Sequence, residues 1–236
     1  MVIHMTDGIQ SLNEIRIVLA LGMLSLACVI DIRKREINDI LWIVFGGVAV
    51  LLFFLSGELW HSFVTLAISL IIVPIALLIW RVGMFGGADA LCLIVLSALA
   101  PMTTLGTSPI TPFSTLTNAA LLSVTPIFVN IIRNLIAILK KEDIFKGIED
   151  SKLRKALAFC IGYRAKNSKF NFSIEKMEGT SKKLDFSFKH AEKTSFSTTL
   201  DTWVTPGIPY ILYIAGGFVV QIFYGDIIFN MMHFAK

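Results

Sequence analysis

The sequence is poor in charged residues and in the patterns that bind metals. Only 16% of its 236 residues are charged, whereas 55% are hydrophobic. A soluble domain carries about 25% charged residues, so this composition argues against an ordinary water-soluble protein. The three cysteines, Cys28, Cys92 and Cys160, form no CxxC pair, which argues against a zinc knuckle and a disulfide framework. The four histidines are scattered without an HExxH motif, so a zinc enzyme is not expected.

Long apolar runs dominate the sequence instead. A helix needs about 20 mostly apolar residues to cross the hydrocarbon core of a bilayer. Six segments meet this requirement: residues 15–33, 39–56, 61–81, 88–106, 114–139 and 207–231. The sequence therefore predicts an all-α polytopic membrane protein with six transmembrane helices.

Prolines and paired glycines interrupt some of these segments. Pro74 and Pro126 fall inside predicted spans, where proline removes a backbone hydrogen bond, so we expect kinks there. The pairs Gly46-Gly47 and Gly216-Gly217 predict close packing of helices, because glycine lets two backbones approach.

Basic residues alternate between the two sides of the predicted membrane. Arg33-Lys34-Arg35 follows the first span, and residues 140–203 hold 14 Lys and Arg. The loops at 56–61 and 101–112 hold none. By the positive-inside rule, both termini lie outside and the 140–203 loop is cytoplasmic in a multi-pass protein of the cell membrane. The net charge of +4 thus reflects the membrane topology, and it does not indicate a nucleic-acid-binding surface.

This distribution divides the chain into three parts. Residues 1–139 form a membrane domain with five helices, residues 140–203 a cytoplasmic soluble insert, and residues 204–236 the sixth transmembrane helix, which completes the membrane domain. The insert is interpreted as a small substrate-docking or membrane-surface module. The alternative is a solvated basic loop that binds anionic lipid headgroups.

The insert is expected to be α+β. Residues 149–163 predict an amphipathic helix with Ser151 as its N-cap and Gly162 near its end. The segments 169–174 and 183–188 alternate polar and apolar residues with period two, which predicts a pair of β-strands.

Two carboxylates lie where predicted helices meet the cytoplasmic side. Asp31 ends the first apolar run, and Asp89 begins the fourth, directly after Gly86, Gly87 and Ala88. Ionisable residues next to membrane spans are costly to bury, so each is a candidate for function. Two carboxylates that share one proton and activate a water molecule are the minimum equipment of an aspartic protease.

Each carboxylate also has a simpler interpretation. Asp89 can cap the helix that it begins, and Asp31 can pair with Arg35, one helical turn further on. These roles do not account for the common depth and side of the two residues. Asn38-Asp39 lies where the second span needs a cap, so capping is the expected role of Asp39.

Three motifs resemble those of archaeal preflagellin peptidases and type IV prepilin peptidases, which are GxGD membrane aspartic proteases. They are Asp31-Ile-Arg-Lys-Arg-Glu-Ile-Asn-Asp39, Gly86-Gly87-Ala88-Asp89, and Pro206-Gly207-Ile208-Pro209 before the last span. The resemblance covers most of the chain and implies that Asp31 and Asp89 are the catalytic pair. Ala88 stands where the family has glycine, so a positive φ there would strain the turn by about 1–2 kcal/mol.

The resemblance implies an endopeptidase that cleaves the basic leader from preflagellin or pilin-like precursors at the cytoplasmic membrane face. It implies no metal or organic cofactor and no methyltransferase region. Membrane lipids are further expected partners, and the sequence leaves the oligomeric state open. The alternatives are a small ion-coupled transporter that uses the two aspartates as coupling carboxylates, and a GxGD peptidase acting on remnant signal peptides.

Cys28 and Cys92 provide a structural test of the pair. Each lies one helical turn toward the membrane interior from its aspartate. If Asp31 and Asp89 approach one another, the two thiols should be neighbours beneath them, where small side chains permit tight packing.

Overall fold

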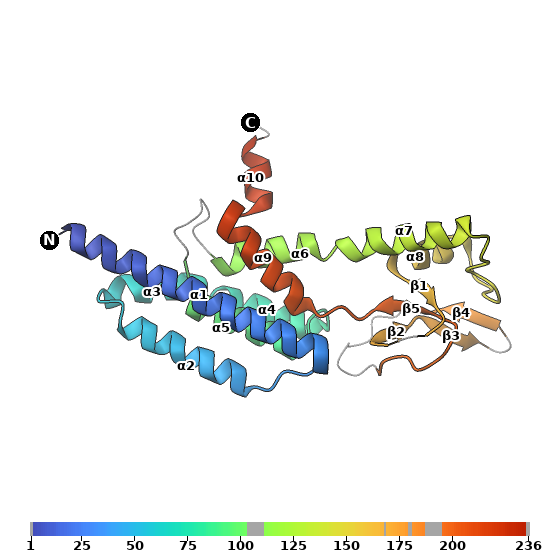
Figure 1. Ribbon diagram of the computed structural model, residues 1–236, viewed down its shortest axis with the longest axis horizontal. Coiled ribbons are helices and arrows are strands. Elements are labelled where there is room, and N and C mark those ends of the chain that lie inside the picture. Colours follow the sequence, from blue (N-terminus) through green and yellow to red (C-terminus); the bar gives the residue numbers. More distant parts are fainter. Residues whose placement is uncertain (1, 103–110, 168, 179–180, 187–194, 235–236) are drawn as a thin grey trace. The chain divides into compact units, whose positions relative to one another are not determined.

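The computed structural model describes residues 2–102, 111–167, 169–178, 181–186 and 195–234 (Figure 1). The chain divides into two compact units. The helical unit comprises Met1–Leu122 and Pro209–Lys236, and the mixed unit comprises Ser123–Ile208. Each unit has its own buried hydrophobic core, which accounts for the division.

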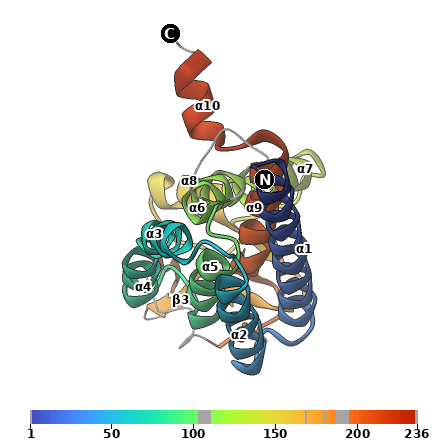
Figure 2. The same ribbon diagram turned by 90° about the vertical axis from the view of Figure 1, so that its left-hand side faces the viewer.

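The helical unit surrounds one central helix. Its helices are α1 (Val2–Lys34), α2 (Ile40–Phe54), α3 (Leu59–Ser69), α4 (Ile72–Val82), α5 (Gly87–Leu99), α6 (Thr111–Leu122), α9 (Tyr210–Tyr224) and α10 (Ile227–Phe234). In Figure 2, α5 lies in the middle of this unit, and α1, α2, α3, α4, α6 and α9 all pack against it. Most of α5 is therefore buried, including the start of the helix, where Asp89 lies.

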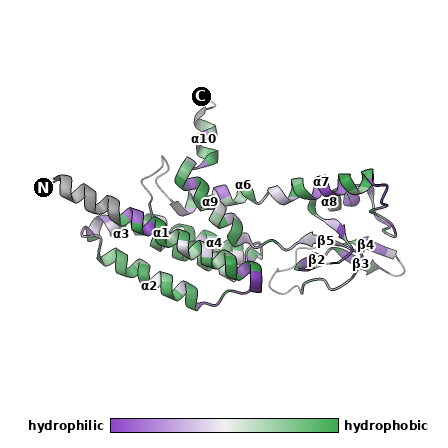
Figure 3. Cartoon of the chain, in the orientation of Figure 1, coloured by the Kyte–Doolittle hydropathy of each residue, from purple (hydrophilic) through white to green (hydrophobic). Residues whose placement is uncertain are grey.

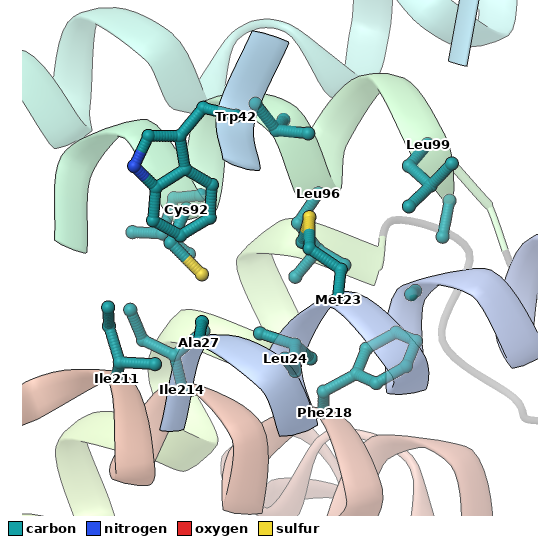
Figure 4. Close-up of a cluster of buried hydrophobic side chains, with 14 of the residues drawn as sticks. Met23, Leu24, Ala27, Trp42, Cys92, Leu96, Leu99, Ile211, Ile214 and Phe218 are labelled. Atoms are coloured by element: carbon teal, nitrogen blue, oxygen red, sulfur yellow. The ribbon is translucent and has the colours of Figure 1, made fainter. Parts of the chain in front are cut away.

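The core of the helical unit combines small side chains with large aliphatic and aromatic ones. Figure 4 shows Met23, Leu24 and Ala27 of α1 beside Cys92, Leu96 and Leu99 of α5, together with Trp42 of α2 and Ile211, Ile214 and Phe218 of α9. Small residues such as Ala27 and Cys92 let the helix backbones approach closely. Helices that are distant in sequence thus converge around α5.

The structure contains helices that are apolar and long enough to cross a membrane, but fewer than the six predicted are found in its described part. Among the described residues, three stretches are long and apolar enough to span a bilayer: Leu12–Lys34, Leu59–Val82 and Pro112–Leu139. The apolar helices α2, α5 and α9 are shorter. The helix predicted over 88–106 ends at Leu99, and residues 103–106 lie outside the described part. A mostly helical chain with a small β-containing insert before its last helices is confirmed.

The outer surface of the helical unit is rich in exposed apolar side chains. Ile43, Leu51 and Phe54 of α2 and Trp60 of α3 each expose more than 60% of their area. Hydrophobic residues dominate these helices, whereas the C-terminal end of α1 becomes hydrophilic (Figure 3). Such a surface is stable against lipid and would be a liability in water.

The glycine pairs behave differently from one another. A Cβ atom on Gly217 of α9 would lie 2.5 Å from the carbonyl oxygen of Thr115 and 2.7 Å from the backbone nitrogen of Ala119 on α6. The prediction of close helix packing is thus confirmed for this pair. It is wrong for Gly46-Gly47, since a Cβ atom added to either glycine would meet nothing within 4 Å.

The described residues of the mixed unit form two helices and two small antiparallel sheets. Its elements are α7 (Thr125–Leu139), α8 (Lys152–Ile161), β1 (Tyr163–Ala165), β2 (Asn171–Ser173), β3 (Glu175–Glu178), β4 (Ser181–Leu184) and β5 (Thr202–Pro206). One sheet has the order β1-β5-β2, and β3 and β4 form the other. Trp203 of β5 is fully buried, stacks on Phe145, and donates its indole N–H to the carbonyl of Ile144 at 2.8 Å. The insert is therefore a folded module, and the alternative of a solvated loop is wrong.

Local signals predicted the helices of this region well. Ser151 caps α8 by accepting a hydrogen bond from the backbone N–H of Arg154, and Gly162 follows its last residue, as expected.

The helices are also interrupted near the two prolines of the predicted spans, as expected. Pro74 is the third residue of α4, which begins after a break from α3, and Pro126 is the second residue of α7.

The predicted pairing of strands 169–174 and 183–188 is wrong. The residues of β2 pair with β5, from Asn171 opposite Pro206 to Ser173 opposite Val204. The hairpin instead joins β3 to β4, from Glu175 opposite Leu184 to Glu178 opposite Ser181. A tertiary partner, β5, captures β2, and the hairpin shifts accordingly; residues 187–188 lie outside the described part.

Asp150 ties the start of α8 to β4. Its buried carboxylate accepts hydrogen bonds from the N–H groups of Leu184 at 2.9 Å and Ser151 at 2.8 Å, and lies 3.3 Å from Arg154. Desolvation opposes ionisation, but these backbone bonds and Arg154 outweigh it and lower the pKa of Asp150. The stabilisation is therefore present above the unfolded pKa of about 3.9 and is lost as pH falls through the lower folded value.

Replacing Asp150 by Asn is expected to loosen this contact. An amide offers one acceptor oxygen where the carboxylate offers two, so at neutral pH we expect a cost of about 1.5 kcal/mol. Hydrogen exchange of residues 175–184 measures it as about tenfold lower protection. Glu178→Gln, which removes an exposed ion pair with Lys183, is the control and should change protection little. Equal protection in wild type and Asp150→Asn would refute this role.

Candidate active site

Asp89 lies buried in the first turn of α5. Its Oδ2 atom accepts a hydrogen bond from the backbone N–H of Gly86 at 2.9 Å. This bond satisfies one of the N–H groups that the start of a helix leaves without a helical partner. The capping role considered for Asp89 is therefore confirmed, although it caps from the third helical position and Gly86 occupies the N-cap position. The turn fixes the carboxylate at the end of the central helix.

The glycines before Asp89 serve close approach, and no unusual φ is involved. Gly86 has an extended backbone, with φ −75° and ψ 160°, and a Cβ there would lie 3.3 Å from Oδ2 of Asp89. Gly87 and Ala88 are the first two residues of α5. Ala88 is not among the residues with positive φ, so alanine introduces no strain at this motif position.

The opposite end of α5 is held by a buried arginine. Arg16 of α1 donates a hydrogen bond to the carbonyl of Leu99 at 2.9 Å and one to that of Ala98 at 3.4 Å. Those carbonyls have no helical partner at a C-terminus, and a cation there also interacts favourably with the helix dipole. Side chains at both ends, Arg16 and Asp89, therefore fix α5 in place.

Asp31 lies in the last turn of α1 and is partly buried. The helix ends when Arg35 adopts a positive φ of 59° and donates its backbone N–H to the carbonyl of Asp31 at 2.9 Å. Arg35 also lies close enough to interact electrostatically with the Asp31 carboxylate. The region between α1 and α2 borders a cavity of about 630 Å³ whose lining includes Lys34 and Glu36.

Asp39 does not act as the predicted cap of α2. It occupies the N-cap position, but its side chain makes no capping hydrogen bond. The neighbouring Asn38 accepts the bond instead, from the backbone N–H of Ile40 to Oδ1 at 2.9 Å. Asp39 itself has a helical backbone, and an N-cap side chain works from an extended backbone.

The cysteine test supports convergence of the two aspartate-bearing helices. Cys28 and Cys92 belong to the same buried cluster and lie close enough to interact electrostatically, and Cys92 also interacts with Asp89. The two thiols thus lie in the same core, in agreement with the expectation that they are close together. Cys28 further donates its S–H to the carbonyl of Ile211, with the sulfur at 3.7 Å. The turns below Asp31 and Asp89 thus meet beside the start of α9.

Sequence reasoning missed two aromatic residues at this site. The rings of Phe85 and Tyr210 lie 4.6 Å apart, centroid to centroid. Phe85 directly precedes Gly86, and Tyr210 directly follows Pro209, so the contact packs the start of α9 against the turn that holds Asp89. Their positions beside two glycine- and proline-containing motifs were the available signal.

The Pro206-Gly207-Ile208-Pro209 motif has two structural tasks. Within the mixed unit, the backbone N–H of Gly207 donates to the carbonyl of Phe170 at 3.1 Å, and a Cβ on Gly207 would lie 2.5 Å from that oxygen. In the helical unit, Pro209 has an extended backbone and occupies the N-cap position of α9. The glycine is thus needed for a close approach, and the second proline begins a helix.

The described residues offer no grouping of three or more His, Cys, Asp or Glu side chains that could hold a metal ion. The candidate catalytic groups at this site are the carboxylates of Asp31 and Asp89, on two helices that pack against one another. Such groups can donate, accept and share protons around a water molecule.

Comparisons with known proteins identify the family of this chain. A model described as the type IV leader peptidase family matches residues 18–139, which include Asp31 and Asp89. A model described as the archaeal peptidase A24 C-terminus, type II, matches residues 162–227. The chain is also 24% identical over 229 residues to a preflagellin peptidase of Methanocaldococcus jannaschii, covering 89% of this chain and 93% of that protein. The first match spans more than half of the chain, so this protein belongs to the type IV leader peptidase family and is a protease.

Proposed function

We propose that this protein is a membrane-embedded aspartic endopeptidase in which Asp31 and Asp89 form the catalytic pair. It removes the basic N-terminal leader from preflagellin or type IV pilin-like precursors at the cytoplasmic face of the membrane. The packing of α1 against α5, with Cys28 and Cys92 buried in one core, supports the proposal, because these two helices carry Asp31 and Asp89. The similarity to a preflagellin peptidase supports the substrate class.

The chemistry requires the two carboxylates to act together on one water. At about 3 Å they cannot both ionise, so the pair holds a single proton. The ionised partner removes a proton from the water, and the protonated partner donates a hydrogen bond to the scissile carbonyl. Attack gives a tetrahedral intermediate, which collapses when the leaving amine takes a proton from the pair. The proton belongs to the pair, so its two macroscopic pKa values are shared.

The proposed topology has six spans, both termini outside and residues 140–203 in the cytoplasm. It assigns residues 1–139 and 204–236 to the membrane domain. The distribution of basic residues supports it, since Arg33-Lys34-Arg35 and residues 140–203 then share one side. The exposed apolar faces of α2 and α3 support contact with lipid. Membership of a protease family favours this interpretation over the transporter alternative.

Incubation of the purified protein with leader-bearing precursors tests the substrate class. We expect preflagellin or a pilin-like precursor to be shortened by its leader, and mass spectrometry of the product identifies the cut. A precursor whose basic leader residues are replaced by glutamine is the matched control. If preflagellin and the pilin-like precursor, each with its native leader, both stay intact after prolonged incubation, the proposed substrates are refuted.

Replacing Gly86 by Ala is expected to slow cleavage about tenfold, because the new Cβ presses on Oδ2 of Asp89 and shifts the carboxylate by a few tenths of an ångström. The melting temperature should change little, since a side-chain terminus can yield. Ala88→Gly is the companion variant. It should bring no gain in rate, because Ala88 already has an ordinary backbone conformation. An unchanged rate in Gly86→Ala would contradict the tight fit.

A further inference from the structure

A cavity of about 720 Å³ lies within the mixed unit, and none of the residues of the aspartate site lines it. Its wall comes from the C-terminal half of α7, the loop that follows, β1 and the residues after β1. Eight of the lining residues are charged: Arg133, Lys140, Lys146, Arg164, Lys166, Glu142, Asp143 and Asp201. The proposed peptidase mechanism uses none of them.

Arg164 and Asp201 line the cavity as an ion pair whose two charges cancel. Arg164 donates from Nε to Oδ1 of Asp201 at 2.7 Å and from Nη2 to Oδ2 at 2.8 Å. This two-point hydrogen bond raises the pKa of Arg164 and lowers that of Asp201, so both stay charged. Its Nη1 also donates to the carbonyls of Asp143 and Lys146. The pair therefore builds the wall and leaves the remaining charges to set the potential of the cavity.

The remaining charges give the cavity a cationic excess. Four basic residues, Arg133, Lys140, Lys146 and Lys166, face two acidic ones, Glu142 and Asp143. No ion pair joins these four cations to a carboxylate in the part of the chain that the structure describes. A cluster of this kind attracts an anion and repels a basic leader.

Arg133 is held in a defined orientation. Its guanidinium carbon lies 3.6 Å from the centroid of the Tyr163 ring, a cation–π contact between two lining residues. The Tyr163 hydroxyl in turn accepts a hydrogen bond from Nδ2 of Asn171 at 3.1 Å. A planar guanidinium held in place is well suited to bind a phosphate with two parallel hydrogen bonds.

The helix that carries Arg133 also has a lipid-facing character. α7 ends the apolar stretch Pro112–Leu139, and it bears both hydrophobic and hydrophilic residues (Figure 3). Its buried Asn134 donates to the carbonyls of Phe159 and Gly162, both at 2.8 Å, and so fixes its polar face on the end of α8. Its exposed apolar residues include Phe128, Val129, Ile132, Leu135, Ile136 and Leu139.

We propose that this cavity binds the phosphate-bearing headgroup of an anionic membrane lipid. Arg133, Lys140 and Lys166 contact the phosphate, while the acyl chains lie along the exposed apolar side of α7. Glu142 and Asp143 accept hydrogen bonds from headgroup hydroxyls, which favours a polyol headgroup such as phosphoglycerol. Basic cavities beside membrane helices are suited to such headgroups, since charge and hydrophobic contact act together. The site is independent of leader cleavage.

Native mass spectrometry of the full-length protein in non-ionic detergent tests the site. Titration with phosphatidylglycerol is expected to give one saturable binding event, and phosphatidylcholine should bind far more weakly. The double variant Lys140→Gln/Lys166→Gln should weaken phosphatidylglycerol binding about 10- to 30-fold. The double variant Lys152→Gln/Lys176→Gln removes the same charge from exposed positions outside the cavity and should bind like wild type.

Three outcomes would overturn the proposal. Equal weakening by both double variants would show diffuse attraction to a basic surface. Equal binding of phosphatidylcholine and phosphatidylglycerol would show that the anionic headgroup is not recognised. Binding of soluble glycerol phosphate that depends on Lys140 and Lys166, without retention of the lipid, would assign the cavity to free phosphate esters. Equal melting temperatures of the two double variants verify that both are folded.

Discussion

Asp31→Asn and Asp89→Asn are each expected to lower the rate of leader removal by roughly 10³-fold or more. An amide can neither accept the proton from the attacking water nor return one to the leaving amine, and general acid–base catalysis is lost with it. Because the two carboxylates act as a unit, the double variant should be no worse than either single one. Cleavage of a preflagellin precursor, followed by gel shift and mass spectrometry, measures the loss.

The structure makes Asp89→Asn a sharper test than most substitutions of a buried acid. The amide oxygen of Asn can still accept the hydrogen bond that Asp89 receives from the N–H of Gly86, so the start of α5 remains capped. An unchanged melting temperature would then attribute the lost activity to proton transfer. Asp39→Asn is the matched control in an exposed position and should largely retain activity. Processing at the wild-type rate by either Asp31→Asn or Asp89→Asn would refute the catalytic pair.

Features decided by neighbouring residues could be predicted from the sequence. The cap of α8 at Ser151, its end at Gly162 and the interruption before Pro126 all depend on backbone chemistry within one turn. The same holds for Asp89 at the start of α5, because glycines before an apolar run predict a helix start there. The burial of Cys28 and Cys92 in one core followed from helix geometry once the two aspartates were placed at one depth.

Features decided by tertiary partners could not be predicted in this way. The strand β5 was missed, because Thr202–Pro206 has two sheet partners that are distant in sequence, β1 and β2. Its competition for β2 also shifted the hairpin toward Glu175 and Leu184. At the site, the contact of Phe85 with Tyr210 depends on where α9 docks, which no local pattern encodes.

The capping of α2 shows how small the deciding difference can be. Asn38 and Asp39 are both good capping residues, and the sequence alone does not choose between them. Asp39 has φ −59° and ψ −21°, so its side chain cannot reach back to the helix start, and Asn38 accepts the bond from Ile40. The choice between adjacent caps is set by the path of the chain out of α1, where Arg35 turns through a positive φ.

Gly217→Ala is expected to be the most destabilising single-methyl change in the helical unit. The added Cβ would lie 2.5 Å from the carbonyl oxygen of Thr115 and 2.7 Å from the backbone nitrogen of Ala119, and neither backbone atom can rotate away. α6 and α9 must therefore separate, which also weakens the 2.8 Å hydrogen bond from Thr115 Oγ1 to Oε1 of Gln221. We expect a loss of about 2–3 kcal/mol, or a melting temperature lower by about 5–10 °C.

Gly46→Ala is the matched control, because it adds the same methyl group within the apolar helix α2. Nothing lies within 4 Å of its Cβ position, so alanine should leave the melting temperature unchanged or raise it through its higher helix propensity, by up to about 1 kcal/mol. Since α9 also places Tyr210 against Phe85 and Ile211 against Cys28, a displaced α9 should reduce cleavage as well. Equal melting temperatures for the two variants would show that α6 and α9 are not packed this closely. Reduced stability with full activity would instead show that the turn holding Asp89 does not depend on α9.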